Sequence, residues 1–408
     1  SMSNYEFTTQ ISQDEYDGFV RNHPNANLLQ SWNWARIKSN WDHVYTAVKK
    51  DGQIEAAALV LIKNLPAGFT MLYIPRGPVM DWNDQELLDF YMKNLKKEAK
   101  KHHALFVKMD PPVVIGKYYS HNKERPHNGN EQLVNAFEKA GCIHQGFTTM
   151  IEESIQARFQ SIIDKPEDLM ASLPKKTKKL IKEAEKRDLE IISGREELVD
   201  EFTHLVEMTE SRKHVSLRNR EYFTKLLNTY KEDAIIMLAI ADPQKIINKN
   251  EKKLADLDAQ LAALPENHKK KRFILEEQKA GVVKDISNLQ EIIDSLEDGT
   301  SPVAVAGVLT IVYGENAEML YAGMDERFRR FMPQYKTYIE NFQWAFDHGC
   351  TEFSMGGVEG TLDDGLTHFK DNFAPYIYEY IGEFDLPVLF YKPAKMLYEK
   401  KRHSMRES

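Results

Sequence analysis

Residues 43–62, HVYTAVKKDGQIEAAALVLI, carry the pattern that decides the fold. Two apolar segments, His43–Val48 and Ile54–Ile62, flank Asp51-Gly52, a dipeptide typical of tight hairpin turns. Three further segments follow, two of them short and apolar and the middle one amphipathic: Met71–Tyr73, Gln85–Lys101 and Ala104–Met109. Their periodicities predict a hairpin, a third strand, a helix and a fourth strand.

The same order recurs in the second half of the chain. Its five segments are Ala234–Ala241, Val303–Tyr313, Met319–Tyr321, Gln334–His348 and Glu352–Met355. Recurrence of one order of elements indicates a divergent internal duplication. Strand–strand–strand–helix–strand is also the order of GNAT-type acyltransferases. We therefore predict an α+β fold with two GNAT-like subdomains.

The second copy contains an insertion where Asp51-Gly52 makes the turn of the first. Residues 244–300 include a single aromatic residue, and their apolar residues alternate at spacings of three and four. Two such runs flank Pro265. This pattern is typical of coiled coils, and we expect an antiparallel helical hairpin arm. The expected domains are 2–146 completed by 388–408, 147–243 with 301–387, and the arm at 244–300.

The composition limits the classes of protein to which this chain can belong. The chain has 408 residues, two cysteines and a formal net charge of −8. Residues 2–20 are polar and acidic, unlike a secretory signal, and the apolar runs are shorter than the ~20 residues of a membrane-spanning helix. Two distant cysteines argue against a disulfide framework. These features favour a cytoplasmic protein.

Several catalytic signatures are missing from the sequence. We find no phosphate-binding GxxxxGK loop, no GxSxG elbow, no HExxH and no histidines at metal-ligand spacing. The pyrophosphate loop usual in GNAT enzymes is also missing, which lowers the expectation of a coenzyme A donor. We therefore expect no cofactor and no metal.

Seven short polar–aromatic phrases stand out instead. They are QSxxWxxxK (30–38), YxPRGPxxD (73–81), DP (110–111), KKTK (175–178), RxxxY (218–222), YAGM (321–324) and GLxxFK (365–370). In this order, and together with the arm, they resemble the Fem family of peptidoglycan-branching aminoacyltransferases (FemABX). The likeness covers nearly the whole chain. The phrases are most similar to the streptococcal alanine- or serine-adding Mur branching enzymes.

The resemblance implies a reaction and its partners. The family transfers an aminoacyl group from aminoacyl-tRNA to an amine of a muramyl pentapeptide precursor, usually the ε-amine of the stem lysine. The implied acceptor is lipid-linked or nucleotide-linked, and the arm favours the lipid-linked form (lipid II). A lipid-linked acceptor implies peripheral contact with the inner face of the plasma membrane. The amino acid, the branch position and the oligomeric state stay open.

The resemblance also implies catalytic residues. Lys370, with Phe369 beside it, would stabilise the oxyanion or hold the tRNA acceptor end. The alternative for Lys370 is an ordinary solvated lysine. Asp110 would position the acceptor amine and take its proton, and the alternative is an Asp-Pro turn that closes a strand.

Binding residues follow from the same phrases. Lys38, Arg218 and Tyr222 resemble the residues that contact the diphosphate-sugar, and the spacing puts Arg218 and Tyr222 on one face if that stretch is helical. Three more residues complete this expected set: Trp34, Arg76 and Tyr321. Arg76 has the alternative role of a loop brace, Tyr321 that of a core tyrosine, and Arg218 that of a surface ion pair.

The segment 174–187 carries seven basic and two acidic side chains. A basic helix face can bind tRNA phosphates, and we assign this role to Lys175, Lys176, Lys178 and Lys179. The alternative is a solvated helix face. Two other functions stay open: an acyl-CoA-dependent GNAT-type N-acyltransferase, and a non-catalytic RNA-binding or coiled-coil scaffold.

Overall fold

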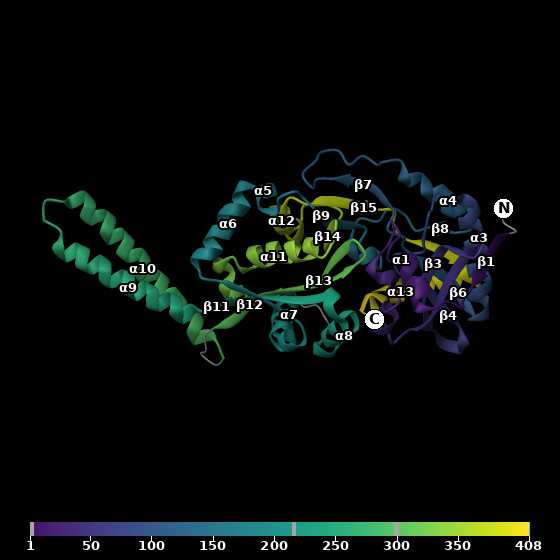
Figure 1. The fold of residues 1–408 in the computed structure, drawn as a ribbon, viewed down its shortest axis with the longest axis horizontal. Helices are drawn as coiled ribbons and strands as arrows, with labels where there is room; N and C mark the ends of the chain where they lie inside the picture. The colour runs from purple at the N-terminus through teal and green to yellow at the C-terminus, as the bar shows by residue number, and fades with distance from the viewer. Residues whose placement is uncertain (1–3, 214–217, 298–301, 408) are drawn as a thin grey trace.

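The computed structural model describes residues 4–213, 218–297 and 302–407. Within them the chain forms two mixed sheets of eight strands each, and a helical hairpin projects from the second sheet (Figure 1). The hairpin consists of α9 (Pro243–Ala263) and α10 (Lys269–Ser295). The molecule is therefore elongated, with the first sheet and the hairpin at opposite ends.

The first sheet has the order β1-β2-β3-β4-β6-β16-β8, with β5 beside β3. Its strands are β1 Tyr5–Thr8, β2 Asp42–Lys50, β3 Gln53–Asn64, β4 Thr70–Ile74, β5 Val79–Met80, β6 Ala104–Met109, β8 Ile143–His144 and β16 Phe384–Pro387. The second sheet has the order β10-β11-β12-β13-β14-β9-β15-β7. Its strands are β7 Val114–Tyr118, β9 Phe159–Asp164, β10 Glu190–Gly194, β11 Ala234–Ala241, β12 Val303–Tyr313, β13 Asn316–Met324, β14 Glu352–Val358 and β15 Tyr376–Tyr380.

The remaining helices cover these sheets and their ends. They are α1 Gln13–Val20, α2 Trp34–Ile37, α3 Gln85–Lys101, α4 Leu133–Lys139, α5 Leu169–Ser172, α6 Lys175–Lys186, α7 Val199–Lys213, α8 Arg220–Tyr230, α11 Pro333–Asp347, α12 Gly365–Lys370 and α13 Tyr391–Glu407. The second sheet lies between α11 on one face and α7 and α8 on the other (Figure 1). Apolar residues of α3 and α4 pack with one face of the first sheet.

Both predicted copies are present at the predicted places. The hairpin β2–β3, then β4, α3 and β6, match the first copy, and β11–β12, β13, α11 and β14 match the second. In each copy the third strand lies parallel to the fourth, with the helix between them in sequence. The periodic apolar residues that predicted each strand are buried in the sheets. A mixed α/β fold with a repeated unit is therefore confirmed.

The two copies differ in how the third strand meets the fourth. In the first sheet, β4 pairs with β6 from Thr70 to Ile74, almost the whole length of both strands. In the second sheet, β13 pairs with β14 only from Asn316 to Glu318, and the strands then separate. Beyond that point β14 pairs only with β9, after an irregularity between Ser354 and Gly357. The second sheet is thus open at its centre.

Two strands lie outside the ranges that the sequence predicted for their subdomains. β7 comes from the first range, 2–146, but pairs with β15 in the second sheet. β16 comes from the range 301–387 but pairs with β6 and β8 in the first sheet. Each sheet therefore receives a strand from the other half of the chain. Short edge segments carry little periodic signal of their own, so their partners are set by tertiary packing.

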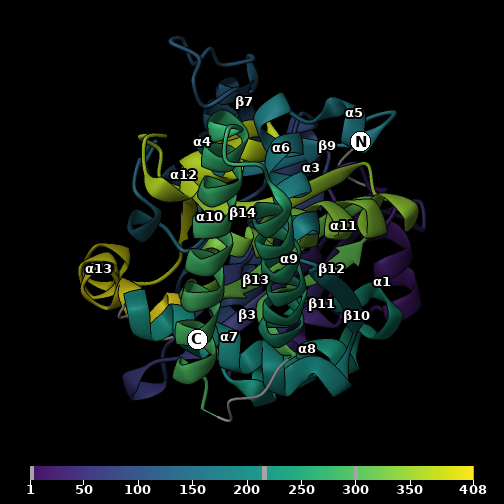
Figure 2. The ribbon, with the colours of Figure 1, turned by 90° about the vertical axis from the view of Figure 1, so that its left-hand side faces the viewer.

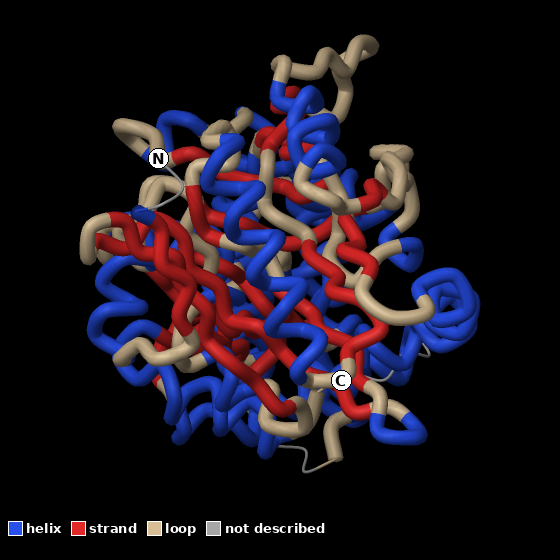
Figure 3. The backbone as a smooth tube through the Cα atoms, turned by 90° about the vertical axis from the view of Figure 1, so that its right-hand side faces the viewer, coloured by secondary structure: helices blue, strands red, loops and turns tan. Residues whose placement is uncertain are grey.

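One apolar core joins the two sheets. It contains side chains of β3 from the first sheet, of β11 and β12 from the second, and of α7 and α8. Figure 3 views the molecule from the end that carries the first sheet and shows the strands in red with helices around them. The space between the two sheets is therefore a fixed part of the fold.

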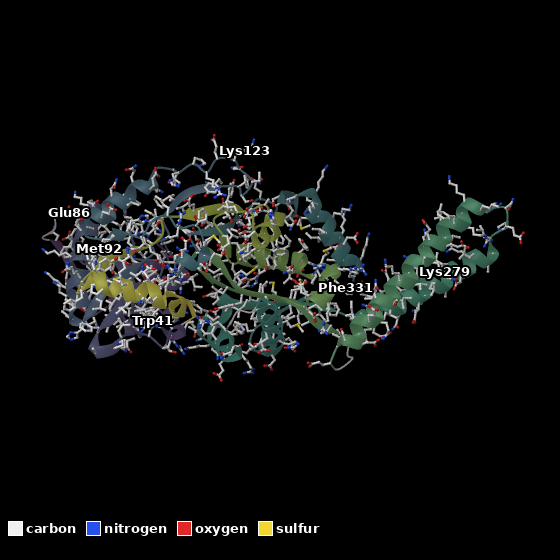
Figure 4. The ribbon with its side chains drawn as sticks, turned by 180° about the vertical axis from the view of Figure 1, so that it is seen from behind. Trp41, Glu86, Met92, Lys123, Lys279 and Phe331 are labelled. Carbon is white, nitrogen blue, oxygen red and sulfur yellow. The ribbon has the colours of Figure 1, made fainter. Side chains whose placement is uncertain are left out.

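The hairpin helices pack side by side along an apolar seam that includes Leu257, Leu275 and Val282. Three other apolar residues of the hairpin, Ile247, Leu289 and Ile293, lie at its base and join Phe331 in a core of the second sheet. The end-on view shows the two helices side by side, and Figure 4 places Phe331 at the base and Lys279 far along the hairpin (Figures 2 and 4). The predicted arm boundary at 300 lies outside the described residues.

None of the helices in the described part of the chain is both long and apolar enough to span a bilayer.

Candidate active site

A cavity of about 230 Å³ lies between the first sheet and α8. It collects five of the predicted binding residues, namely Trp34, Lys38, Arg218, Tyr222 and Tyr321. They come from α2, the end of α2, the start of α8 and β13, so segments from both copies are needed to form it. We call this space the cationic cavity.

The QSxxW phrase places α2 against the cavity. The buried Gln30 amide donates to the carbonyls of Leu59 (3.2 Å) and Pro75 (2.8 Å), and its oxygen accepts from the Leu59 N–H (3.0 Å). A side chain at Gly77 would collide with Gln30, with a Cβ only 2.7 Å away. Ser31 shares a hydrogen bond of 2.6 Å with the Tyr230 hydroxyl at the end of α8. These contacts fix both walls of the cavity.

Lys38 lies among aromatic rings and other cations. Its Nζ is 5.6 Å from the ring centre of Trp34 and 5.7 Å from that of Tyr222. Burial, and then the positive charges of Arg218 and Lys225, lower the pKa of Lys38 to about 7. An anion bound here would relieve this repulsion, because an opposite charge favours the protonated amine. The electrostatics of the cavity therefore suit a phosphate group.

Arg218 lies before α8 and not within it. The helix begins at Arg220, and the Asn219 side chain caps it by accepting from the Tyr222 N–H at 3.0 Å. The condition under which Arg218 and Tyr222 would share a helical face is therefore not met, because the helix does not extend to Arg218. The Arg218 guanidinium nevertheless lies 4.5 Å from the Tyr222 ring centre, and the Tyr222 and Tyr321 rings meet edge to face.

Asp110 and Arg76 lie behind the lining of the cationic cavity. Asp110 is 1% exposed and accepts from the Tyr73 hydroxyl (2.7 Å) and from the Arg76 N–H (2.6 Å). Tyr73 itself lines the cavity and also accepts from the Gln156 amide at 3.3 Å. Burial raises the pKa of Asp110 to about 6, against the lowering effect of Arg76. The carboxylate is therefore linked to the cavity by its hydrogen bond with the Tyr73 hydroxyl.

Arg76 braces the junction of the two sheets. Its guanidinium donates to the Ala157 carbonyl at 2.8 Å and lies 4.6 Å from the ring centre of Tyr380. These contacts correspond to the bracing role that the sequence left open, and they place Arg76 outside the cavity lining. Its role in substrate binding stays a prediction.

Lys370 lies at the opening of the second sheet. Its side chain is buried, with 5% exposed, which excludes an ordinary solvated lysine. The ammonium donates to the Gly357 carbonyl at 3.0 Å. A Cβ at Gly356 would be 3.8 Å from this ammonium and 4.0 Å from the Met319 carbonyl. Met319 precedes Leu320 and Tyr321, which line the cationic cavity. Lys370 therefore lies where β13 and β14 separate, next to the strand that forms the cavity wall.

A continuous set of contacts connects Asp110 with Lys370. Arg76 bonds to Asp110 through its N–H and to Ala157 through its guanidinium. Ala157 abuts Gly357 so closely that a Cβ on Gly357 would lie 2.4 Å from the Ala157 methyl group. Gly357 in turn accepts from Lys370. Glycine at this position lets the segment before β9 approach the opening.

Phe369 packs in the core of the second unit. Its ring lies 5.3 Å from that of Tyr338, 5.7 Å from that of Tyr335 and 5.8 Å from that of Phe373. These contacts fix α12 on the sheet and so position Lys370. A direct catalytic role for Phe369 stays a prediction.

The four predicted tRNA-binding lysines lie on α6, next to the Lys370 segment. Lys175, Lys176 and Lys179 are exposed and Lys178 is half-buried. The Thr177 hydroxyl donates to the Asn372 carbonyl, two residues beyond Lys370. The basic face is thus solvated, and the contact of Thr177 joins α6 to the segment after Lys370. The role of these lysines in tRNA binding stays a prediction.

The sequence did not single out three residues at the cavity. Trp41 and Gln156 line it, and Lys225 contributes positive charge and donates to the Ser39 hydroxyl at 2.6 Å. Trp41 lies three residues after the QSxxWxxxK phrase, so its proximity in sequence was a usable signal. Gln156 precedes a strand in a segment without a motif, and only the junction of the sheets brings it here.

Comparisons with known proteins agree with this architecture. Lipid II:glycine glycyltransferases of Staphylococcus haemolyticus (strain JCSC1435) and Staphylococcus aureus are 28% and 29% identical to this chain over 394 and 397 residues. Both alignments cover 92% of this chain and 91% of the relative. A crystal structure of FemX aligns with a TM-score of 0.74 and 26% identity, covering 97% of this chain and 99% of that chain. The model of the FemAB family matches residues 11–399, and the chain therefore belongs to the FemAB family.

Proposed function

We propose that this protein is an aminoacyl-tRNA-dependent transferase of peptidoglycan branching. It adds an amino acid to the ε-amine of the stem-peptide lysine, or to the branch begun there, on a lipid-linked muramyl precursor. The observation that carries the proposal is the cationic cavity beside the buried Lys370, in a chain that aligns along 92% of its length with lipid II:glycine glycyltransferases.

The cationic cavity supports a diphosphate-bearing acceptor. Lys38 and Arg218 supply cations, and Trp34, Tyr222 and Tyr321 supply aromatic surface. Guanidinium and ammonium groups are the preferred partners of phosphate oxygens, and aromatic rings pack well against sugars and bases. A muramyl diphosphate presents these two kinds of surface together.

The opening of the second sheet supports acyl transfer. The acceptor amine attacks the carbonyl carbon of the aminoacyl ester, so a C–N bond forms and the ester C–O bond to the ribose breaks. The proton lost by the amine balances the charge on the ribose oxygen that leaves. The Lys370 ammonium would stabilise the oxyanion, and Asp110, acting through Tyr73, would orient the amine. Because the ester is already activated, no nucleophilic triad is required.

The donor is a charged tRNA in this proposal. Alanine or serine is the favoured amino acid from the sequence phrases, and glycine is the alternative, since it is the donor that the names of the relatives specify. The basic face of α6, next to the Lys370 segment, would contact the tRNA backbone. The protein would work in the cytoplasm and visit the inner face of the membrane.

A donor panel tests the proposal. Purified protein is incubated with lysine-containing lipid II and with Ala-, Ser- or Gly-tRNA, and the acceptor is analysed by mass spectrometry. We expect a mass gain of one residue that RNase treatment abolishes. Transfer from acetyl-CoA without tRNA would instead identify an acyl-CoA N-acyltransferase. Binding of tRNA without any transfer would identify a scaffold.

A further inference from the structure

A second cavity, of about 220 Å³, lies between the first sheet and the C-terminal helix α13. Its lining is almost entirely apolar and includes Leu65, Met71, Phe106, Ala394, Leu397 and Tyr398. No site residue described above lines it. Figure 4 shows α13 on the outside of the first unit, with Trp41 labelled beside it. We call this space the apolar cavity.

The apolar cavity adjoins the cationic cavity on the same face of the first sheet. Leu61 and Tyr73 are paired across β3 and β4 and both line the cationic cavity. The next pair that points to this face, Lys63 and Met71, lines the apolar cavity. Two residues along a strand span about 7 Å. Trp41 joins the two spaces, because it lines the cationic cavity while the Lys63 ammonium lies 5.4 Å from its ring centre.

Leu397 stands at the mouth of the apolar cavity, since it lines the cavity and is still 58% exposed. Two large apolar side chains of the same segment, Phe390 and Met396, are 70% and 69% exposed. The spacing of four residues aligns Lys392, Met396 and Lys400 on a basic, apolar face of α13 that is exposed and turned away from the cavity-lining residues Ala394 and Tyr398. Figure 2 shows α13 standing out from the body of the molecule, so this face is accessible.

Two further cations meet at the rim. Lys63 and Lys401 both line the apolar cavity, and the pKa of Lys63 is lowered, first by burial and then by the charge of Lys401. Positive charge around an apolar opening fits a ligand that combines an anionic group with a hydrocarbon chain. It does not fit an ordinary apolar protein segment as well, because that segment offers no anion to the lysines.

We propose that the apolar cavity binds the polyisoprenyl chain of a lipid-linked diphosphate whose diphosphate lies in the cationic cavity. The order of the two spaces matches the order of the ligand, in which the hydrocarbon begins directly after the diphosphate. Leu397, which lines the cavity and is 58% exposed, lies at the surface from which such a chain enters. This inference rests on the proposed function for the identity of the acceptor, and it selects the lipid-linked over the nucleotide-linked form.

Kinetics with two acceptors of identical head group test the proposal. Both carry the muramyl pentapeptide diphosphate, one on a water-soluble four-isoprene tail and one on a nucleotide. We expect Leu397→Glu to raise KM for the prenyl acceptor by about tenfold or more and to leave KM for the nucleotide acceptor within about twofold. The matched control is Phe273→Glu on the hairpin, where the side chain is 62% exposed. It should change neither value.

A binding measurement separates this proposal from the proposed function, because it needs no transfer. Calorimetry compares geranylgeranyl diphosphate with inorganic diphosphate on the wild-type protein and on Leu397→Glu. We expect the prenyl ligand to bind about tenfold tighter or more, and the variant to lose this advantage. Equal affinities of the two ligands for the wild type would overturn the proposal, even if transfer from aminoacyl-tRNA succeeded. A donor panel without product, combined with the expected binding, would overturn only the proposed function.

Two other outcomes would also overturn the proposal. If Leu397→Glu raised KM for both acceptors equally, the substitution would act on the head-group site and not on a tail site. If it converted a dimer to a monomer in sedimentation without affecting prenyl binding, the exposed face would be an interface between copies of this chain. Circular dichroism of both variants confirms that the exposed substitutions preserve the fold.

Discussion

The two copies of the repeated unit are most informative where they differ. In the first copy, β4 and β6 stay paired from Thr70 to Ile74. In the second, β13 and β14 pair only from Asn316 to Glu318, and the buried ammonium of Lys370 lies where they part. The same order of elements therefore gives one closed sheet, in which the third and fourth strands stay paired, and one open sheet, in which they separate.

The difference shows how the two copies of a duplicated fold can take on different tasks. Strands that part leave backbone groups that need other partners, because an unsatisfied buried carbonyl is costly. Lys370 satisfies the Gly357 carbonyl, and β9 stays paired with β14 along its other side. The closed sheet instead offers a continuous face, on which the cationic and apolar cavities lie side by side. We infer that the opening of the second copy handles the acyl group, and that the closed sheet, together with Arg218, Tyr222 and Tyr321 of the second half, holds the acceptor.

Removing the lysine from the open copy should have the largest effect. We expect Lys370→Ala to lower kcat by about 100- to 1000-fold, the usual loss of one oxyanion donor, with little change in acceptor affinity. Single-turnover rates and acceptor titrations measure the two quantities separately. Lys279→Ala on the hairpin is the control. An unchanged kcat would show that the opening is not the acyl-transfer centre.

Removing a cation from the cavity that the two copies share should mainly affect binding. We expect Arg218→Ala to raise the acceptor Kd by about 10- to 30-fold and to leave kcat nearly constant, because a charge-assisted contact to phosphate is lost. The matched control is Arg220→Ala, two residues away, whose guanidinium forms an exposed ion pair with Asp200. A loss of kcat without a loss of acceptor affinity would contradict the assignment of Arg218 to acceptor binding.

The pH dependence of acceptor binding tests the electrostatic role of Lys38 in the cavity that the two copies share. With a pKa of about 7, Lys38 is protonated below this pH and neutral above it. The protonated form attracts the diphosphate, so affinity should fall by about tenfold as pH rises from 6.5 to 8.5. In Lys38→Arg the charge persists over this range, and the profile should be flat. Equal slopes for wild type and variant would exclude Lys38 as the titrating group.

The smallest effect concerns the backbone that opens the second sheet. Gly356 has a φ of +89°, so Gly356→Ala should lower the free energy of unfolding by about 1 kcal/mol. Gly281 is the control, because it lies in α10 with open space around it. Gly281→Ala should instead stabilise by up to about 1 kcal/mol. Urea denaturation measures both changes, and a stabilised Gly356→Ala would show that the opening does not need the left-handed backbone.

The secondary-structure elements and short motifs that depend on local sequence could be predicted from the sequence. The apolar segments of β2 and β3, and the turn at Asp51-Gly52, predicted the first hairpin, since such local patterns depend only on near neighbours. The exchange of β7 and β16 could not be predicted, because it depends on which distant segment completes each sheet. The start of α8 at Arg220, after the Asn219 cap, was also not predicted. Sequence reasoning also missed Gln156, which belongs to no motif.

By itself, the sequence determined the repeated order of elements and the helical insertion, and it predicted a set of residues for binding an anionic acceptor. The tertiary structure alone decided that Lys370 is buried at the opening of one sheet, that Asp110 lies behind Tyr73, and that an apolar cavity adjoins the cationic one. The physical reason is the distance along the chain over which each kind of interaction acts. Periodicity and turn chemistry act over a few residues, whereas burial, pKa and the adjacency of two cavities arise from contacts between segments hundreds of residues apart.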